Sequence, residues 1–503
     1  MRHENLSRRE VIAIFCALMI SMFVGSLDQT IVSTALPTIV GELGAVDLML
    51  WVTTSYFLAS TITMPIYGKL GDVFGRKYLF CLSQVLFVLG SLLCALSDSM
   101  GSLILGRAVQ GLGGGGSMIL SQAIVADIFP PKERGKYMGI MGISFGASMA
   151  LGPLLGGFFT EQLSWRWCFW MNLPLGLIAL AIAGVCLPHR KRRNAQGDGT
   201  KPSIDVLGII TMAAACTCLI LALSLGGTVL DWNSEQVVGL LVGGVVVAVL
   251  FILIEARAKD PIIPLWLFKN RNFTLCTVAG LILMLGMSGA IAYLPTYFQI
   301  VDGLNAAAAG YMTLPLMLGM MIMSTVSGFL ASKITTIKWM PVIACAVAAV
   351  AFGLLSTITI DTSLWQMGLI LALLGLGVGT GQQILVLIVQ NEFSVSVVGT
   401  TTAANNFFRE IGGTIGSSLV GALFTANLGT KLAEYAGDLA QSIDLNALTP
   451  GMVRAMDSAS QSAIQLAYND ALAPVFGWLC PLLAVACIML FFLRKKPLSS
   501  TND

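Results

Sequence analysis

The strongest constraint on this chain is a set of fourteen stretches of about 20 apolar residues, each long enough to cross a bilayer as a helix. Because a bilayer core offers no water to backbone amides, we expect such stretches to form helices, in which the backbone hydrogen bonds lie within each segment. Only 11% of the residues are charged, against about 25% in a soluble domain. The sequence therefore predicts an all-α polytopic membrane protein with 14 transmembrane helices, near residues 11–36, 48–69, 77–97, 102–127, 135–160, 167–187, 203–225, 236–255, 273–300, 305–331, 340–359, 363–390, 399–427 and 470–493.

Lysine and arginine are distributed unevenly between the two sides of this arrangement. If the N-terminus is cytoplasmic, 23 of the 28 Lys and Arg residues lie on the cytoplasmic side, three lie outside, and Arg107 and Arg409 lie within spans. Because cytoplasmic loops carry the excess of basic residues, we expect a multi-pass protein of the cytoplasmic (inner) membrane with both termini cytoplasmic. The first span follows Arg8 and Arg9 and is too long for a signal peptide, so it is predicted to be an uncleaved anchor.

Residues that usually carry catalytic or metal chemistry are scarce. A net charge of only +2 argues against a nucleic-acid partner. The two histidines, His3 and His189, lie in polar segments, and the eleven cysteines show no metal-ligand spacing. The phosphate-binding pattern G-x-x-x-x-G-K-[ST] does not occur, which excludes an ATP-driven pump. We therefore expect neither enzyme activity nor a metal or other cofactor.

An internal repeat is indicated by glycines that recur at an offset of 264 residues: Gly111, Gly113 and Gly115 match Gly375, Gly377 and Gly379, and Gly152 and Gly157 match Gly416 and Gly421. Two parallel halves related by an axis along the membrane normal are a common transporter architecture. We therefore predict a six-helix bundle at 1–190, a cytoplasmic linker at 191–202, two inserted transmembrane helices at 203–258, and a second six-helix bundle at 259–503. Its outer loop, 428–469, is interpreted as a solvated hairpin, with a lid or partner role as the alternative.

Asp28 is the clearest candidate for a functional residue, because ionisable side chains within a membrane span are costly and usually face a water-filled cavity. It lies in the first span, within Leu27-Asp28-Gln29-Thr30-Ile31-Val32. A carboxylate there could bind a proton and a positively charged substrate in turn. The alternative is a carboxylate near the outer interface that simply reaches water. We favour a role in substrate or proton coupling.

Arg107 and Gln110 lie in the span 102–127, three residues apart and therefore on one face of a helix. An arginine at that depth needs a cavity, carbonyl groups or an acid as partner. From the residues alone, a structural arginine bonded to neighbouring carbonyls and a functional arginine are equally supported.

Arg409 and Glu410 adjoin in the span 399–427. Adjacent residues on a helix point about 100° apart, so these two pair poorly with each other. A structural ion pair and a second proton site both remain open for them.

The connection between the spans 48–69 and 77–97 is short, charged and rich in glycine. An ordinary basic turn on the cytoplasmic side accounts for Lys69 and Lys77, but it does not account for Asp72 between glycines. Asp72 could accept hydrogen bonds from the start of another helix, where the dipole favours an anion, and Arg76 could pair with Asp127. We predict that this loop and its partner have a gating role, carried by Gly68, Asp72, Gly75, Arg76 and Asp127.

The span 135–160 carries a face of small residues, which allows helix backbones to pack closely. Pro153 in this span removes a backbone hydrogen bond and bends the helix. Close packing is therefore part of its role whatever else it does. The residues of interest are Gly152, Pro153, Gly156 and Gly157, with Ser148 one turn before them.

In this order, the segments Gly68–Lys77, Arg107–Gly111 and Gly152–Gly157 resemble the signature motifs of the major facilitator superfamily. The fourteen spans and the run around Asp28 resemble its fourteen-helix drug:proton antiporter family, the EmrB/QacA-like multidrug exporters. The resemblance implies the major facilitator fold: two six-helix bundles plus two inserted helices, which rock around a central cavity with a proton gradient as the energy source. The implied substrate is a small amphipathic drug or dye, cationic if Asp28 binds it.

The resemblance also implies roles for single residues. The position of Arg107 is associated with proton transfer, and the Gly-Pro pattern after Ser148 is found in exporters rather than importers, although Ser148 stands where that motif often begins with glycine. Asp72 is expected to contact the helix that begins near Thr400, and similar transporters often carry an uncharged residue where this chain has Glu410. The segment from Trp165 to Pro174 resembles the family too, and we expect it to be an interfacial anchor.

Other functions compete with drug export. An exporter or proton-linked carrier of a defined lipid, peptide or metabolite is the main alternative, whereas the Gly-Pro helix argues against a nutrient importer. A receptor would be expected to carry a soluble domain, for which the sequence shows no segment. The expected partners are the lipid bilayer and a small amphipathic substrate, and the requirement for a periplasmic adaptor stays open.

Overall fold

The computed structural model describes residues 7–45, 48–188, 204–227, 229–437 and 449–498, and in these ranges the chain is helical apart from its connections and one isolated bridge. Each of the fourteen predicted spans overlaps one long helix. The helices are α1 (Arg8–Leu43), α2 (Met49–Phe74), α3 (Arg76–Ala95), α4 (Met100–Ile128), α5 (Pro131–Gln162), α6 (Trp167–Trp170), α7 (Asn172–Cys186), α8 (Val206–Leu225), α9 (Glu235–Glu255), the 3-10 helix η3 (Leu265–Lys269), α10 (Arg271–Ile300), α11 (Ala306–Tyr311), α12 (Leu314–Lys333), α13 (Trp339–Leu355), α14 (Leu364–Glu392), α15 (Val398–Ala436), α17 (Pro450–Ala455) and α18 (Ser458–Phe491).

The all-helical architecture predicted from the sequence is confirmed, whereas the number of membrane crossings is only partly supported. Eleven helices in the described ranges are long and apolar enough to cross a membrane, and α13 is apolar but shorter. The long helices α2 and α4 are not among them, because serine, threonine and glycine dilute their apolar residues. Fourteen crossings therefore remain a prediction.

Two predicted loops are shorter than expected. The segment 68–77 is not a loop: α2 continues to Phe74, and only Gly75 separates it from α3. Gly75 has φ +98°, a conformation that glycine adopts without steric cost. The outer segment 428–469 is largely helical, because α15 continues to Ala436 and α18 begins at Ser458. Hydropathy locates the part of a helix that lies in lipid and misses the part that projects beyond it. The predicted linker 191–202 lies outside the described residues.

The glycine repeat corresponds to equivalent packing in the two bundles. A Cβ on Gly113 of α4 would collide with the backbone of α3, and a Cβ on Gly377 of α14 would lie 2.8 Å from backbone atoms of α13. Gly111 and Gly375 approach α2 and α12 in the same way. The two repeats therefore place α4 and α14 in corresponding positions, while the domain limits given above stay predictions.

Gly113→Ala is expected to destabilise the protein by roughly 1–3 kcal/mol, because the added methyl group overpacks the contact between α4 and α3. Gly184→Ala is the matched control, since a Cβ at Gly184 of α7 would have no neighbour within 4 Å. The control should be neutral or slightly stabilising, because alanine restricts the unfolded chain. Thermal unfolding in detergent measures both, and equal midpoints would contradict the packing argument.

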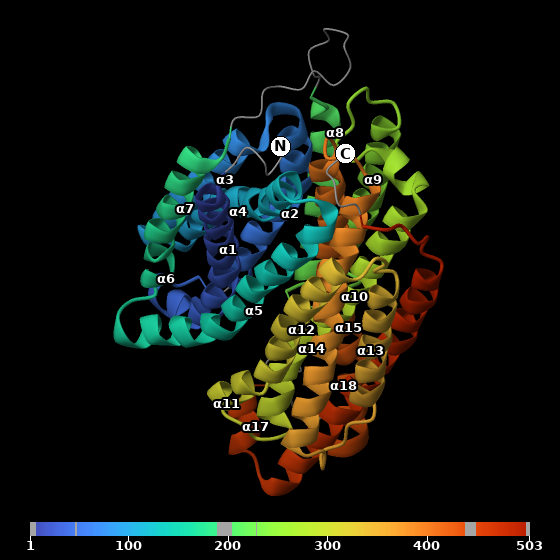
Figure 1. Cartoon of the computed structure of the whole chain (residues 1–503). Coiled ribbons are helices and arrows are strands. Elements are labelled where there is room, and N and C mark those ends of the chain that lie inside the picture. The colour runs from blue at the N-terminus through green and yellow to red at the C-terminus, as the bar shows by residue number, and fades with distance from the viewer. Residues whose placement is uncertain (1–6, 46–47, 189–203, 228, 438–448, 499–503) are drawn as a thin grey trace.

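The two bundles meet at one end of the molecule, where α2 ends and α15 begins. A Cβ on Gly68 of α2 would lie 2.7 Å from the carbonyl oxygen of Gly399 in α15, and one on Gly135 of α5 would lie 2.8 Å from that of Gly328 in α12. Away from this closed end, the bundles diverge toward the end at which α11 and α17 lie, here called the open end (Figure 1). The two chain termini lie on the side of the closed end (Figure 1).

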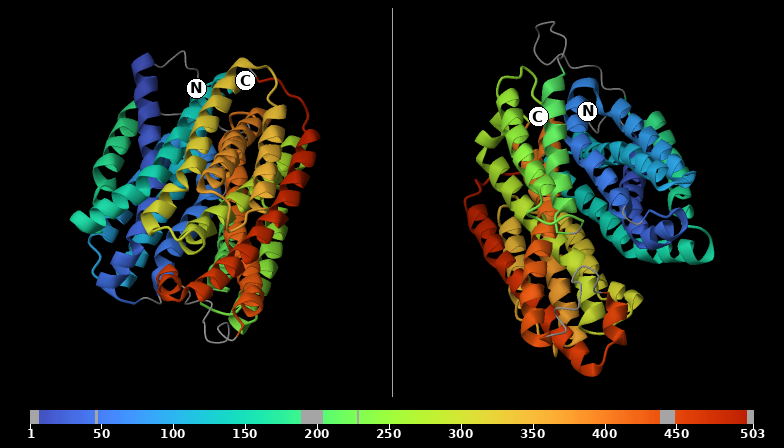
Figure 2. Two further views of the ribbon diagram at one scale, coloured as in Figure 1. Left: turned by 90° about the horizontal axis from the view of Figure 1, so that it is seen from below. Right: turned by 180° about the vertical axis from the view of Figure 1, so that it is seen from behind.

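The two inserted helices lie over the seam between the bundles. α8 packs against α2 of the first bundle and α15 of the second, and the hydroxyl of Ser418 donates to the carbonyl of Leu223 at 2.9 Å. α9 packs on α8 and is mostly exposed, which suits a helix surrounded by lipid. The view from behind shows both helices at this position (Figure 2). The insertion therefore closes one side of the space between the bundles.

Candidate transport site

A cavity of about 530 Å³ lies between the two bundles, within the usual size range of small-molecule sites. Its wall is formed by α1, α2, α4, α5, α8, α10, α14 and α15, so both bundles and the insertion contribute. Methionines and aromatic residues alternate with serine, threonine and glutamine around it. The aromatic members are Tyr56, Phe57, Phe145, Trp232 and Tyr293.

Arg409 and Glu410 of α15 are the two charged residues among those that line the cavity. The Nη1 of Arg409 donates to Oδ1 of Asn406 at 3.0 Å. Within the described residues, no hydrogen bond or ion pair reaches the carboxylate of Glu410, and Arg409 influences it only through its charge. As expected for neighbours on a helix, the two side chains do not form a hydrogen-bonded pair. Glu410 therefore presents an acceptor to whatever enters the cavity.

Asp28 of α1 lies inside the first bundle and does not line the cavity. Its side chain is 0% exposed, which excludes the alternative of a carboxylate that reaches water at the interface. Asp28 forms an ion pair with Arg107, and it accepts hydrogen bonds from Nε2 of Gln110 at 2.8 Å and from Nδ2 of Asn172 at 2.7 Å. These four residues are called the Asp28 cluster below. In this conformation both oxygens of the Asp28 carboxylate have partners within the cluster.

Arg107 connects the Asp28 cluster to the cavity wall. Its Nη1 donates to Oε1 of Gln110 at 2.6 Å, as their spacing predicts, and its Nε donates to the carbonyl of Val52 at 3.2 Å. The guanidinium lies 4.3 Å from the ring centre of Tyr56, a favourable cation–π arrangement. Tyr56 also lines the cavity, so one residue contacts both the guanidinium of Arg107 and the cavity.

Sequence reasoning missed two members of this region, Asn172 and Tyr56. The segment that contains Asn172 was expected to be only an interfacial anchor, yet Asn172 bonds Asp28 from α7. Trp165 is also not a lipid-facing anchor, because it is 1% exposed and donates to Glu42 at 2.8 Å, whereas Trp167 is exposed. An asparagine in an apolar span is a usable signal, because a buried amide is costly unless it is hydrogen-bonded.

At the closed end, Asp72 binds the start of α15. Its Oδ1 accepts from the backbone N–H of Gly399 at 3.1 Å, and its Oδ2 accepts from the N–H and the hydroxyl of Thr400 at 2.7 and 2.9 Å. The predicted contact between Asp72 and this helix terminus is thus present. The carboxylate satisfies backbone donors that a helix start leaves unpaired and lies where the dipole favours an anion.

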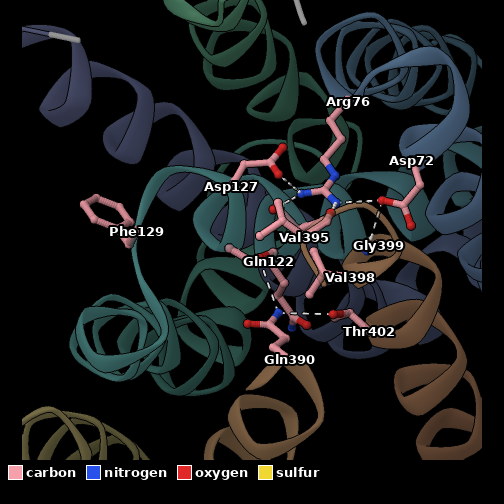
Figure 3. A network of polar contacts seen from close by, with 12 residues as sticks. Asp72, Arg76, Gln122, Asp127, Phe129, Gln390, Val395, Val398, Gly399 and Thr402 are labelled. Carbon is pink, nitrogen blue, oxygen red and sulfur yellow. Dashed lines mark hydrogen bonds and ion pairs between the residues drawn. The ribbon is translucent and has the colours of Figure 1, made fainter. Parts of the chain in front are cut away.

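Arg76 completes the same contact between the two bundles (Figure 3). It pairs with Asp127 at 2.7 Å, as predicted, and with Asp72 at 2.6 Å, and it donates to the carbonyl of Val395 at 3.2 Å. We call Asp72, Arg76, Asp127, Gly399 and Thr400 the closed-end cluster. Its geometry holds α2, α3, α4 and α15 together, while its gating role stays a prediction.

Two of the four residues singled out in α5, Gly152 and Gly156, pack against α1. A Cβ on Gly152 would collide with Thr30, and one on Gly156 would lie 3.1 Å from the carbonyl oxygen of Ile31. Pro153 is exposed, and a Cβ on Gly157 would have no neighbour within 4 Å. Gly152 and Gly156 therefore set the distance between α5 and the segment of α1 that carries Asp28.

Comparison with known proteins agrees with this geometry. The family model described as Major Facilitator Superfamily matches residues 18–417. The chain belongs to the major facilitator superfamily. The matched range includes the Asp28 cluster, both charged cavity residues and the closed-end cluster, so these sites lie within the part of the chain that the superfamily shares.

Several members of the superfamily are similar over most of their length. The multidrug transporter protein MdtP of Bacillus subtilis is 36% identical, covering 96% of this chain and 93% of its own, and multidrug resistance protein 3 of the same organism is 32% identical over 97% and 96%. An uncharacterized MFS-type transporter of Mycobacterium tuberculosis is 38% identical over 99% and 71%. The solved structure of the proton:xylose symporter XylE, at 12% identity, shares the fold with a TM-score of 0.64 over 97% of this chain and 98% of its own.

Proposed function

We propose that this protein exports amphipathic, cationic drugs or dyes across the cytoplasmic membrane in exchange for protons, by alternating access. The observation that carries the proposal is the cavity, in which the carboxylate of Glu410 faces a wall of methionine and aromatic side chains. Soft, adaptable methionines suit ligands of varied shape, and aromatic faces attract cations. Two relatives are named multidrug transport or resistance proteins, which supports drugs as the substrate class.

The closed end is assigned to the cytoplasm, because basic residues gather there. Arg8 and Arg9 begin α1, and Arg76 and Lys77 begin α3 at the same end. Cytoplasmic loops carry such excess, so the fourteen helices would cross the membrane with both termini inside. The open end would then face outward, and this conformation would be the outward-facing one.

Proton coupling is assigned to the Asp28 cluster. Protonation of Asp28 would remove its ion pair with Arg107 and leave the guanidinium held by Gln110, the carbonyl of Val52 and the ring of Tyr56. Because Tyr56 lines the cavity, a shift of Arg107 would change the wall that the substrate contacts. Each proton moving down 100 mV supplies about 2.3 kcal/mol, which is available to drive the exchange.

Glu410→Gln is expected to weaken the binding of ethidium roughly 10- to 100-fold, because a charge-assisted contact contributes about 1.5–3 kcal/mol. Binding of an uncharged amphipathic dye should change little. Equilibrium fluorescence titration in detergent measures affinity, and proton flux in proteoliposomes under an imposed pH gradient measures exchange. Glu161→Gln, at an exposed glutamate of α5, is the matched control.

The same assay tests the proposal as a whole. If ethidium stimulates proton flux through the wild-type protein, the antiport of cations is supported. If the wild-type protein binds no cationic dye and moves no protons with one, drug export fails. The alternative, a proton-linked carrier of a defined lipid, peptide or metabolite, would then replace it.

A further inference from the structure

A line of side-chain hydrogen bonds joins the two bundles at the wall of the cavity. Arg409 lines the cavity and donates to Oδ1 of Asn406 at 3.0 Å. The Nδ2 of Asn406 donates to Oε1 of Gln122 at 3.0 Å. Arg409 and Asn406 belong to α15 of the second bundle, whereas Gln122 belongs to α4 of the first. All three side chains are buried, and Gln122 lines the cavity together with Arg409, so these bonds cross the bundle interface at the cavity wall.

Asn406 is held in a single orientation by its partners. Besides its bonds to Arg409 and Gln122, its Nδ2 donates to the carbonyl of Thr402, one turn earlier, at 2.9 Å. An amide side chain offers two N–H donors and one oxygen acceptor, and here both kinds are engaged. Loss of Arg409 from the acceptor would free the amide to rotate, which would weaken its bond to Gln122.

The line continues from Gln122 into the closed-end cluster. The next residue of α4, Ala123, accepts a hydrogen bond from Arg76 through its carbonyl. The Nε2 of Gln390 donates to the carbonyl of Gln122 at 3.5 Å and to Thr402 at 3.1 Å, so α14 is joined to the same point (Figure 3). A displacement of Gln122 would therefore also move the neighbouring carbonyl of α4 that accepts the hydrogen bond from Arg76.

We propose that Arg409, Asn406 and Gln122 form a polar relay. Through it, the charge in the cavity determines how strongly the two bundles are held together at the closed end. Arg409 is a positioning residue in this relay. With the cavity empty, it orients Asn406 toward Gln122 and the bundles stay joined. A cation beside Glu410 repels the guanidinium, the bond to Asn406 is lost, and the closed end opens more easily. This last step rests on the proposed function, whereas the mechanical link between Arg409 and the closed end does not.

Hydrogen–deuterium exchange of the full-length protein in detergent tests the link without any ligand. We expect Arg409→Met and Gln122→Met each to raise exchange about 3- to 10-fold in peptides that cover 68–76 and 398–402, which corresponds to the loss of one hydrogen bond. The double variant should exceed either single variant by less than about twofold, because the residues act in one line. Gln84→Met is the matched control: Gln84 is a buried amide whose partners, Ser21 and Ser117, belong to the same bundle.

The outcomes separate the relay from the proposed function. Additive effects of the two substitutions, or closed-end exchange in Arg409→Met equal to wild type, would overturn the relay. Gln122→Asn, which shortens the amide by one methylene group, replaces Gln122→Met if that variant does not fold. Saturating ethidium should raise closed-end exchange in the wild-type protein and add nothing in Gln122→Met, at a concentration that fluorescence titration shows to saturate the variant as well. If ethidium does not bind the wild-type protein at all, the proposed function fails, and the double-variant comparison still decides the relay.

Discussion

Asp28→Asn is expected to reduce ethidium-driven proton flux in proteoliposomes at least about 100-fold, to the background of empty vesicles. Asparagine has nearly the shape of aspartate and can still accept from Arg107, but it cannot bind and release a proton. The substitution also leaves the charge of Arg107 buried without its counter-ion, and breaking such a pair costs about 3–5 kcal/mol. Proton flux measured under an imposed pH gradient must therefore be interpreted together with the thermal stability of the same preparation.

A second variant separates the loss of coupling from the loss of stability. In Asp28→Asn/Arg107→Gln both charges are gone, and the polar side chains can hydrogen-bond with Gln110 and Asn172 as before. Its unfolding temperature should recover most of what the single variant loses, because neutral groups carry no large desolvation cost. Its proton flux should stay at background. Recovery of flux together with stability would show that the Asp28 cluster is structural and that protons use another residue.

Under the proposed function, Glu410 and Asp28 are placed for different tasks. Glu410 lines the cavity and has no hydrogen-bonded partner among the residues that the structure describes, so a substrate in the cavity would contact it directly. Asp28 does not line the cavity, and its carboxylate is bonded to Arg107, Gln110 and Asn172, so a substrate would not contact it in this conformation. This division differs from the expectation that Asp28 itself binds the cation, an expectation that binding assays on Asp28→Asn would test.

Contacts that depend on local spacing or on helix termini were predictable from the sequence. Gln110 lies one turn from Arg107, and helix electrostatics predicts that Asp72 meets the first amides of a helix, which the family resemblance indicated to be α15. Apart from the pair of Arg76 with Asp127, contacts between distant helices were not predictable, because no local pattern encodes the rotation of one helix against another. The bond from Asn172 of α7 to Asp28 and the bond from Asn406 to Gln122 are of this kind. For the same reason, the sequence could not decide which acid faces the cavity.

Asp72→Ala is expected to open the closed end. The carboxylate of Asp72 receives two backbone N–H groups and one hydroxyl from the start of α15, and hydrogen bonds to a charged group contribute about 1.5–3 kcal/mol each. Arg76 keeps Asp127 as a partner, so the substitution does not leave its charge unpaired. The substitution therefore weakens mainly the contact between the two bundles, and the population of molecules should shift toward an inward-facing state.

Labelling of arginine by phenylglyoxal, quantified by peptide mass spectrometry, measures this shift on the native chain. Arg134 lies at the closed end, is 1% exposed, and donates to the carbonyl of Gln390 in the second bundle at 3.3 Å. Its labelling should rise about tenfold or more in Asp72→Ala, since each 1.4 kcal/mol changes a population ratio tenfold. Arg166, near the open end and partly exposed, serves as the internal reference.

The matched control is Asp260→Ala, at an acid whose ion pair with Lys69 spans 3.9 Å and is partly exposed. Exposed pairs contribute about 0–1 kcal/mol, so this variant should label like the wild-type protein. If Arg134 reacts equally in Asp72→Ala and in the control, the closed-end cluster does not gate the cavity. The bundles would then be held together at this end by the packing of glycines such as Gly68 against α15. If only Asp72→Ala exposes Arg134, the free energy that keeps the two bundles joined resides largely in the bonds between one carboxylate and the start of one helix.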